Sequence, residues 1–222
     1  MKVTALEGHR VWAATYDSTP NPLLALERRL LPKLLGEAAG LRALDLACGT
    51  GHWAAYLASC GAQAWGVDFC GEMLACAHLS LRGRLVAGAA GRLPFSAACF
   101  DLVVCSFALG YLQDLDAALR EAARMAVRGA RVLLSDVHPE AIAHGWSRSF
   151  RSGTVRYEIE NTPHSFDTIR RCAEAAGLAL EAEEHAGFGA PELPIFAQAG
   201  KADAFAASAG IPAVWISRWS KR

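Results

Sequence analysis

LRALDLACGTGHW, residues 41–53 of this 222-residue chain, joins an apolar run that ends in an acid to a glycine turn and to the start of a second apolar segment. This order predicts a strand, a tight turn at Gly49-Thr50-Gly51 and a helix. Glycine has no Cβ and tolerates positive φ, so a ligand can approach such a turn closely. The helix start behind the turn offers free backbone N–H groups. We therefore expect the main cofactor loop of the protein here.

Strands and helices are predicted to alternate around this turn. A leucine-rich helix at 23–39, bent near Pro32 and ended around 36–40, comes first. Strands are expected at 42–47, 62–68, 84–88, 100–106, 131–137, 178–185 and 213–219, and further helices at 51–60, 72–81, 116–127 and 165–176. Alternation at these lengths predicts an α/β fold, a doubly wound and mostly parallel sheet with helices on both faces.

Three segments fall outside this alternation. Residues 1–21 and 187–210 read as irregular, and 138–165 reads as an insertion with a short strand or hairpin at 154–160. We expect one domain. Within it we expect an N-terminal helical lid at 1–40, a cofactor-binding core at 41–137, a substrate-side insertion at 138–165, and a final helix with two strands at 166–222.

Composition excludes several classes of function. The formal net charge is zero and the sequence pI is about 7.0, with no basic stripe, so neither a nucleic acid nor a charged membrane surface is expected as partner. No signal peptide and no run near the roughly 18 apolar residues of a membrane helix are found. The seven cysteines include no CxxC and sit mostly in apolar runs, which is typical of reduced thiols in a cytoplasmic protein.

Several motifs occur in the order typical of one family. Asp45-Leu-Ala-Cys-Gly-Thr-Gly51 is followed by an acid-ended strand at 66–69, by Glu72-Met-Leu74, by Arg92-Leu-Pro-Phe95 and by the apolar run 100–104. The chain thereby resembles the small-molecule branch of the class I S-adenosylmethionine-dependent methyltransferases. The segment Trp12-x-x-x-Tyr16-Asp17 also resembles the entry segment of small-molecule members. The resemblance implies seven strands in the order 3-2-1-4-5-7-6, with strand 7 antiparallel, and S-adenosylmethionine as cofactor.

This cofactor assigns roles to the predicted loop. Asp45 is expected near the cationic amino group, and the Asp68 carboxylate can accept hydrogen bonds from the vicinal ribose hydroxyls. Phe69 and Met73 can flank the adenine. Family members often carry an acid before Leu-Pro-Phe that this chain lacks, which leaves a backbone contact from Ala89 or Ala90. The full set of expected cofactor-binding residues is Tyr16, Asp45, Ala47, Cys48, Gly49, Gly51, Asp68, Phe69, Met73, Ala89, Ala90 and Ser106.

Other functions compete with this interpretation. Gly49-x-Gly51-x-x-Ala54 also fits a dinucleotide fingerprint, but Asp45 beside the turn would repel a pyrophosphate. A non-catalytic scaffold with a methyltransferase-like fold is a second alternative. A thiol-based arsenite methyltransferase is a third, disfavoured because no cysteine lies in the predicted insertion.

The acceptor is expected to be a small molecule, aromatic or anionic, that takes the methyl group on an O, N or C atom. A neutral histidine can remove a proton from a phenol-like hydroxyl, and His138, His144 and His164 are the candidates. His52 is expected either at the cofactor or as an ordinary helix start, whereas His9, His78 and His185 read as structural. Substrate contacts are predicted for Trp12, Tyr111, Trp146, Arg148 and Arg151. No metal site is predicted, and a monomer and a homodimer both remain open.

Overall fold

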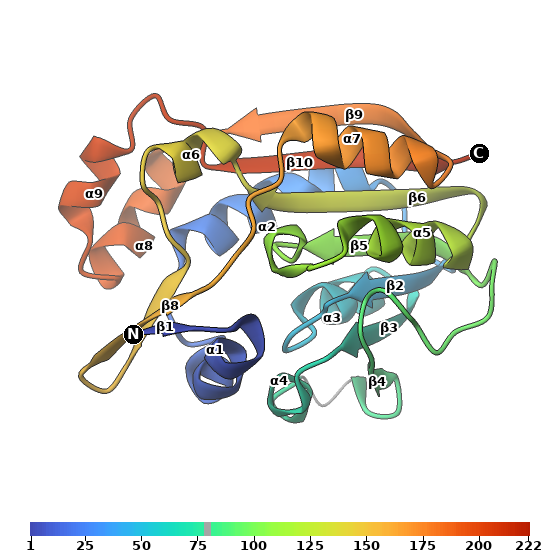
Figure 1. The fold of residues 1–222 in the computed structure, drawn as a ribbon, viewed down its shortest axis with the longest axis horizontal. Coiled ribbons are helices and arrows are strands. Elements are labelled where there is room, and N and C mark those ends of the chain that lie inside the picture. The colour runs from blue at the N-terminus through green and yellow to red at the C-terminus, as the bar shows by residue number, and fades with distance from the viewer. Residues whose placement is uncertain (78–80) are drawn as a thin grey trace.

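A computed structural model describes residues 1–77 and 81–222 of the chain. Its centre is a seven-stranded sheet in the order β4-β3-β2-β5-β6-β10-β9 (Figure 1). The strands are β2 (Arg42–Leu46), β3 (Gln63–Asp68), β4 (Leu85–Ala87), β5 (Phe100–Ser106), β6 (Ala126–Val137), β9 (Leu178–Ala186) and β10 (Val214–Lys221). Only β10 runs antiparallel to its neighbours. Counted along the chain this is 3-2-1-4-5-7-6, so the predicted order is confirmed.

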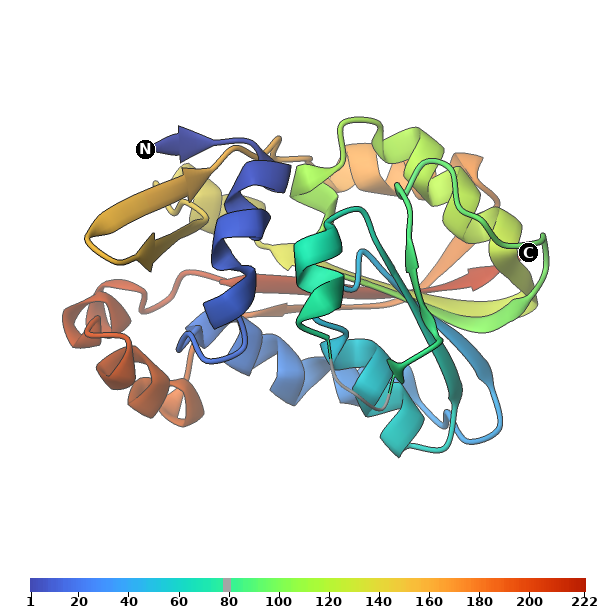
Figure 2. The ribbon, with the colours of Figure 1, turned by 90° about the horizontal axis from the view of Figure 1, so that it is seen from below.

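Helices cover both faces of this sheet, as predicted. α2 (Pro22–Leu35) and α3 (His52–Ser59) pack on one face, whereas α5 (Leu115–Met125) and α7 (Phe166–Ala175) pack on the other. Figure 2 shows the sheet nearly edge-on between these two layers. Each layer closes its own apolar core against the sheet, because the central strands are buried on both sides.

Local signals set the ends of the helices. The side chains of Asn21, Asp114 and Ser165 accept hydrogen bonds from the free N–H groups at the starts of α2, α5 and α7. Gly36, at φ 70°, follows the end of α2 as expected. The helix predicted at 116–127 was expected to reach residue 127, and this is wrong, since α5 ends at Met125 and β6 starts directly after it.

The N-terminal segment is not irregular, and that prediction is wrong. Thr4 and Glu7 form a capping box that starts α1 (Ala5–Trp12), and the turn η1 (Ala13–Thr15) follows. Ahead of the helix, β1 (Lys2–Val3) pairs in parallel with a strand of the insertion. The capping-box spacing was present in the sequence and is the signal that identifies this helix.

The insertion carries the predicted hairpin. After α6 (Pro139–Ala143), β7 (Ser149–Ser152) pairs antiparallel with β8 (Val155–Ile159), and β1 completes a small sheet in the order β1-β8-β7. The strand pairing therefore ties the first residues of the chain to the predicted insertion.

Two further stretches differ from the expectation. The segment 187–210 folds into η4 (Ala190–Glu192), α8 (Leu193–Gln198) and α9 (Ala202–Ala207) rather than an irregular loop. The predicted helix 72–81 is shorter, because α4 covers Gly71–Ala75, and residues 78–80 with His78 lie outside the described residues.

The small elements gather where the parallel strands end. α1, the hairpin β7–β8 and the pair α8–α9 lie on the side of the sheet to which β2 and β5 point (Figure 1), and η3 (Leu109–Tyr111) follows β5 there. Open α/β sheets bind ligands at this edge. In the described part of the chain, no helix is both long enough and apolar enough to cross a membrane.

Candidate active site

A cavity of about 1140 Å³ opens at the carboxyl ends of the strands. Its floor comes from the ends of β2, β3 and β5, and its outer walls come from α1, the hairpin and the segment around α8 and α9. Pockets for one small ligand usually measure roughly 300–1,000 Å³. The space therefore suits two small molecules side by side.

The glycine loop forms one wall of the cavity. Ala47, Gly49 and Gly51 all have positive φ, at 57°, 55° and 79°. A Cβ on Gly49 would come within 3.0 Å of the Met73 Cε atom, so a side chain would fill the space above the loop. Gly51 differs from Gly49, because it does not line the cavity. A Cβ on Gly51 would lie 2.5 Å from the Leu81 side chain. Gly51 therefore serves packing rather than ligand contact.

Asp68 links the loop to the end of β3. Its Oδ2 accepts a hydrogen bond from the N–H of Gly49 at 2.7 Å, and its Oδ1 accepts one from Cys70 at 2.8 Å. Burial raises the pKa of this carboxyl. Each carboxylate oxygen has a second lone pair, so Asp68 can hold the loop and still accept bonds from a ligand diol.

Asp45 lies beneath the loop and also reaches the cavity. Its Oδ2 accepts a hydrogen bond from the Ala54 N–H at 2.8 Å, which fixes the first turns of α3. Burial raises the pKa of Asp45 to about 8. A ligand cation placed beside this carboxyl would favour its ionised form.

Glu27 is a cavity residue that the sequence reasoning missed. It lies on α2, is fully buried and lines the cavity floor. Its Oε1 accepts hydrogen bonds from the hydroxyls of Ser106 and Ser135, and its Oε2 accepts one from Trp53. The signal was present, because Glu27 interrupts the apolar row of α2 that faces the core.

The remaining predicted cofactor residues also line the cavity. They are Tyr16, Ala47, Cys48, Phe69, Met73, Ala89, Ala90 and Ser106. Phe69 is 44% exposed, which leaves an apolar ring available to a ligand. The pair Ala89 and Ala90 lies in the loop between β4 and β5, so the missing family acid leaves only backbone and methyl groups at that wall.

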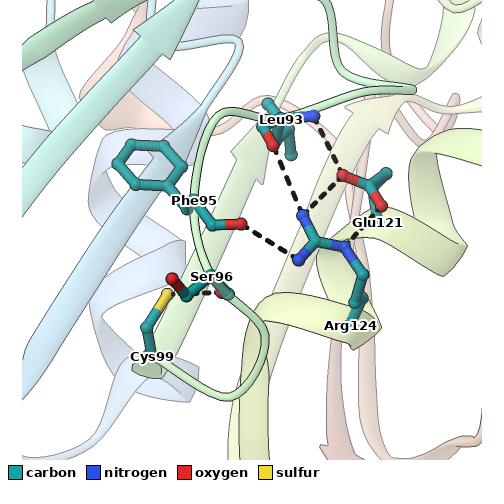
Figure 3. Close-up of polar contacts among 6 residues, drawn as sticks. All are labelled: Leu93, Phe95, Ser96, Cys99, Glu121 and Arg124. Carbon is teal, nitrogen blue, oxygen red and sulfur yellow. Dashed lines mark hydrogen bonds and ion pairs between the residues drawn. The ribbon is translucent and has the colours of Figure 1, made fainter.

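A polar anchor fixes the far end of that loop (Figure 3). The Arg124 guanidinium donates to the carbonyls of Leu93 and Phe95 at 3.4 and 3.0 Å and to the Glu121 carboxylate at 2.6 Å. Glu121 in turn accepts a bond from the Leu93 N–H at 2.9 Å. α5 thereby holds the loop that carries Ala89 against the cavity.

None of the three histidines predicted as bases lies on the cavity. His138 is buried, caps α6 through its Nδ1 and contacts His185 at 3.0 Å through its Nε2. His144 is exposed and bonds the Glu140 carbonyl, and His164 lines a separate small pocket. His138 does not reach the expected site because β6 continues into α6, whose first turn uses this side chain as a cap.

Two other histidines line the cavity instead. His9 on α1 bonds the Ala5 carbonyl at 2.7 Å and lies edge-on to Tyr111. His52 follows Gly51 at the start of α3. Burial lowers the pKa of both imidazoles, that of His52 to about 4, so His52 is neutral at pH 7. The expectation that His9 is merely structural is corrected by its position on the cavity wall.

Aromatic side chains form the outer wall. Trp12 stacks on Phe150 of the hairpin with ring centroids 4.7 Å apart, and Tyr16 meets Trp12 edge-on at the same distance. Trp146 stacks on Phe188 at 5.6 Å. These contacts join α1, the insertion and the segment after β9, so the predicted substrate residues Trp12 and Trp146 share one cavity.

The two predicted arginines differ in their surroundings. Arg148 pairs with Asp136, donates to the Phe107 carbonyl and lies over the Tyr111 ring at 4.4 Å. Arg151 is exposed and faces Arg156 directly across the hairpin, and both line the cavity. Like charges opposite each other in a sheet destabilise it, so an anion between them would relieve the repulsion.

Comparison with known proteins shows which family the core resembles. A family described as "Methyltransferase domain" matches residues 44–134. The demethylmenaquinone methyltransferase of Mycolicibacterium gilvum is 40% identical over 128 residues, which cover 56% of either chain. Residues 44–134 of the chain are therefore similar in sequence to methyltransferase domains. The chain spans a little over half the length of the curated relatives it matches.

Solved structures of methyltransferases share the fold. An S-adenosylmethionine dependent methyltransferase from Mesorhizobium loti has a TM-score of 0.67 at 22% identity, over 88% of this chain and 97% of its own. The geranyl diphosphate C-methyltransferase of Streptomyces coelicolor, solved with S-adenosyl-L-homocysteine, has a TM-score of 0.66 at 14% identity, over 89% and 79%. The predicted fold class is thereby confirmed.

Proposed function

We propose that the protein transfers a methyl group from S-adenosylmethionine to an O, N or C atom of a small-molecule acceptor. The observation that carries this proposal is the glycine loop beside two buried acids, Asp45 and Asp68. Burial raises the pKa of Asp45 to about 8, and a cationic amino group beside this carboxyl would favour its ionised form, whereas a pyrophosphate would oppose it. The methyltransferase family match over residues 44–134 supports the same donor.

The residues divide the work of binding the donor. Asp68, already bonded to Gly49, would accept from the ribose hydroxyls, and Phe69 and Met73 would flank the adenine. Ala89 and Ala90 would offer backbone contacts. When bound, S-adenosylmethionine supplies a methyl group bonded to a sulfonium, and the group that leaves on methyl transfer is a neutral thioether.

The chain's contribution to the reaction is position. The acceptor atom must lie in line with the methyl group, and such alignment can supply several kcal/mol of the barrier. The cavity volume and its aromatic outer wall support an aromatic acceptor beside the donor. For an acceptor that must lose a proton, the neutral imidazoles of His9 and His52 are the candidates on the cavity wall.

The charge and shape that we propose for the acceptor are inferred from the residues of the outer wall. Arg151 and Arg156 support a carboxylate or phosphate group on an aromatic acceptor. The named relatives are, by their names, methyltransferases that act on demethylmenaquinone. We propose that residues 1–40 cover the site as a lid and that the whole chain acts as one domain.

Calorimetric titration of the protein with S-adenosylmethionine, and separately with NAD, tests the donor. We expect binding of S-adenosylmethionine and none of NAD. The reverse result would sink the proposal and revive the dinucleotide alternative. Binding of the donor, with no labelled methyl transferred to any compound of a broad acceptor panel, would favour the non-catalytic scaffold.

A further inference from the structure

Glu27 is a charged residue in a position that packing alone would give to an apolar one. On α2 it continues the row of Leu24, Leu31 and Leu35, and Leu31 and Leu35 are buried with it in the core beneath the cavity. Burying a carboxyl among apolar side chains is costly unless it is bonded or paired. A buried carboxyl at this position therefore suggests a role in ligand binding.

The bonds to Glu27 leave one acceptor position open. Oε1 accepts from two hydroxyls, those of Ser106 at 2.7 Å and of Ser135, which fills both of its lone pairs. Oε2 accepts only the long contact of 3.3 Å from the Trp53 indole. Among the described residues, no lysine or arginine forms an ion pair with Glu27.

The partners of Glu27 fix where this open position lies. Trp53 is in the first turn of α3, directly behind the glycine loop, and Ser106 ends β5 at the cavity floor. Both belong to the donor side of the cavity, whereas the acceptor wall is formed by α1, the hairpin and α8. Glu27 is thus held beneath the loop that would carry the amino-acid end of the donor.

We propose that Glu27 binds the α-ammonium group of the methyl donor through its free Oε2 lone pair. This inference rests on the proposed function and deepens it. Burial raises the pKa of Glu27 and so favours its neutral form when no cation lies beside it. A cationic ammonium beside this carboxyl would favour its ionised form and donate a charge-assisted N–H bond to it. Asp45 also fixes the first turns of α3 through the Ala54 N–H, so a substitution there would mix loop support with any contact to the ligand. Among the described residues, Glu27 has no such bond to the loop backbone.

A pair of ligands isolates this contact. S-adenosylhomocysteine and 5′-methylthioadenosine are both neutral at sulfur and share the adenosine, but only the first has the amino-acid end. The isosteric variant Glu27→Gln is expected to raise the Kd of S-adenosylhomocysteine at least tenfold in calorimetry. The Kd of 5′-methylthioadenosine is expected to stay within twofold of the wild-type value.

Two further variants complete the experiment. Glu27→Met extends the apolar row of α2, so it keeps the fold, and it is expected to give the same selective loss. Asp101→Asn removes an acid that pairs with Arg42 away from the cavity and should leave both affinities unchanged.

The possible results separate the two proposals. Equal weakening of both ligands in Glu27→Gln and Glu27→Met would mean that Glu27 only supports the loop, and this would overturn the inference while leaving the proposed function standing. Unchanged affinity for both ligands would overturn it as well. Failure of the wild-type protein to bind either ligand would overturn both proposals.

Discussion

The two sides of the cavity are built in different ways. The donor side consists of the ends of β2, β3 and β5 with the loops that follow them, so its backbone is held by the central sheet. The acceptor side is assembled from three separate segments, α1, the hairpin and α8–α9, which are joined by the pairing of β1 with β8 and by aromatic contacts. A fixed backbone suits a constant cofactor, whereas side chains on added segments can change with the acceptor.

The largest expected effect lies on the donor side, at Asp68. Asp68→Ala removes the acceptor of the Gly49 and Cys70 N–H groups and, on this account, of the ribose hydroxyls. Each bond to a charged group is worth about 1.5–3 kcal/mol, so we expect affinity for S-adenosylmethionine to fall at least about 100-fold. Calorimetry measures this loss, and an unchanged Kd would remove Asp68 from the site.

Substitutions on the acceptor side should lower activity toward the acceptor and leave donor binding almost unchanged. The double variant Arg151→Ala, Arg156→Ala is expected to keep the Kd for S-adenosylmethionine within about twofold. It is expected to lower kcat/KM for an anionic acceptor about fivefold, since two exposed ionic contacts worth about 0.5 kcal/mol each are lost. The acceptor would first be found by transfer of a labelled methyl group. Arg120→Ala, an exposed arginine on α5, is the matched control. Loss of donor binding in the double variant would break the separation of the two sides.

A smaller effect is expected at the anchor of the β4–β5 loop. Arg124→Met removes the donors to the Leu93 and Phe95 carbonyls (Figure 3). Because the side chain is partly exposed, we expect a loss of about 1 kcal/mol in the free energy of unfolding, measured in urea, and a several-fold rise in the donor Kd. A stability loss without any change in donor affinity would show that the loop does not need this anchor to bind the donor.

The last prediction concerns the pH dependence of stability. Burial lowers the pKa of His52 to about 4, below its ordinary value near 6.5, so the unfolded chain binds more protons at this residue between these values. Stability from His52 is therefore full above pH 6.5 and is lost as the pH falls towards 4. His52→Gln should flatten this part of the pH dependence in urea unfolding at pH 5 and pH 7. An identical pH slope in both proteins would refute the assignment.

The sequence predicted the donor side well because its signals are local. A glycine turn after an apolar run, an acid at the next strand end and the alternation of strands and helices all follow from neighbouring residues. The strand order was implied by the family resemblance, and the observed order agrees with it. Glu27 was missed although it visibly interrupts the apolar row of α2, but its partners Ser106 and Ser135, 79 and 108 positions away, could not be predicted from neighbouring residues.

The acceptor side was predicted less well because it depends on distant contacts. β1 exists only through its pairing with β8, more than 150 positions later, and no local pattern indicates this. His138 was expected at the ligand because it follows the end of a strand. Instead its side chain caps α6 and contacts His185, and it does not line the cavity. The helix α1, in contrast, was signalled by Thr4 and Glu7 and could have been found.

Hydrogen exchange of the backbone amides, with and without saturating S-adenosylhomocysteine, tests the division of the cavity most directly. Protection is expected in residues 46–54, 67–73 and 88–91, and little change in the hairpin at 149–159 or in 193–207. Protection confined to the hairpin and to 193–207, with none in the glycine loop, would contradict the account.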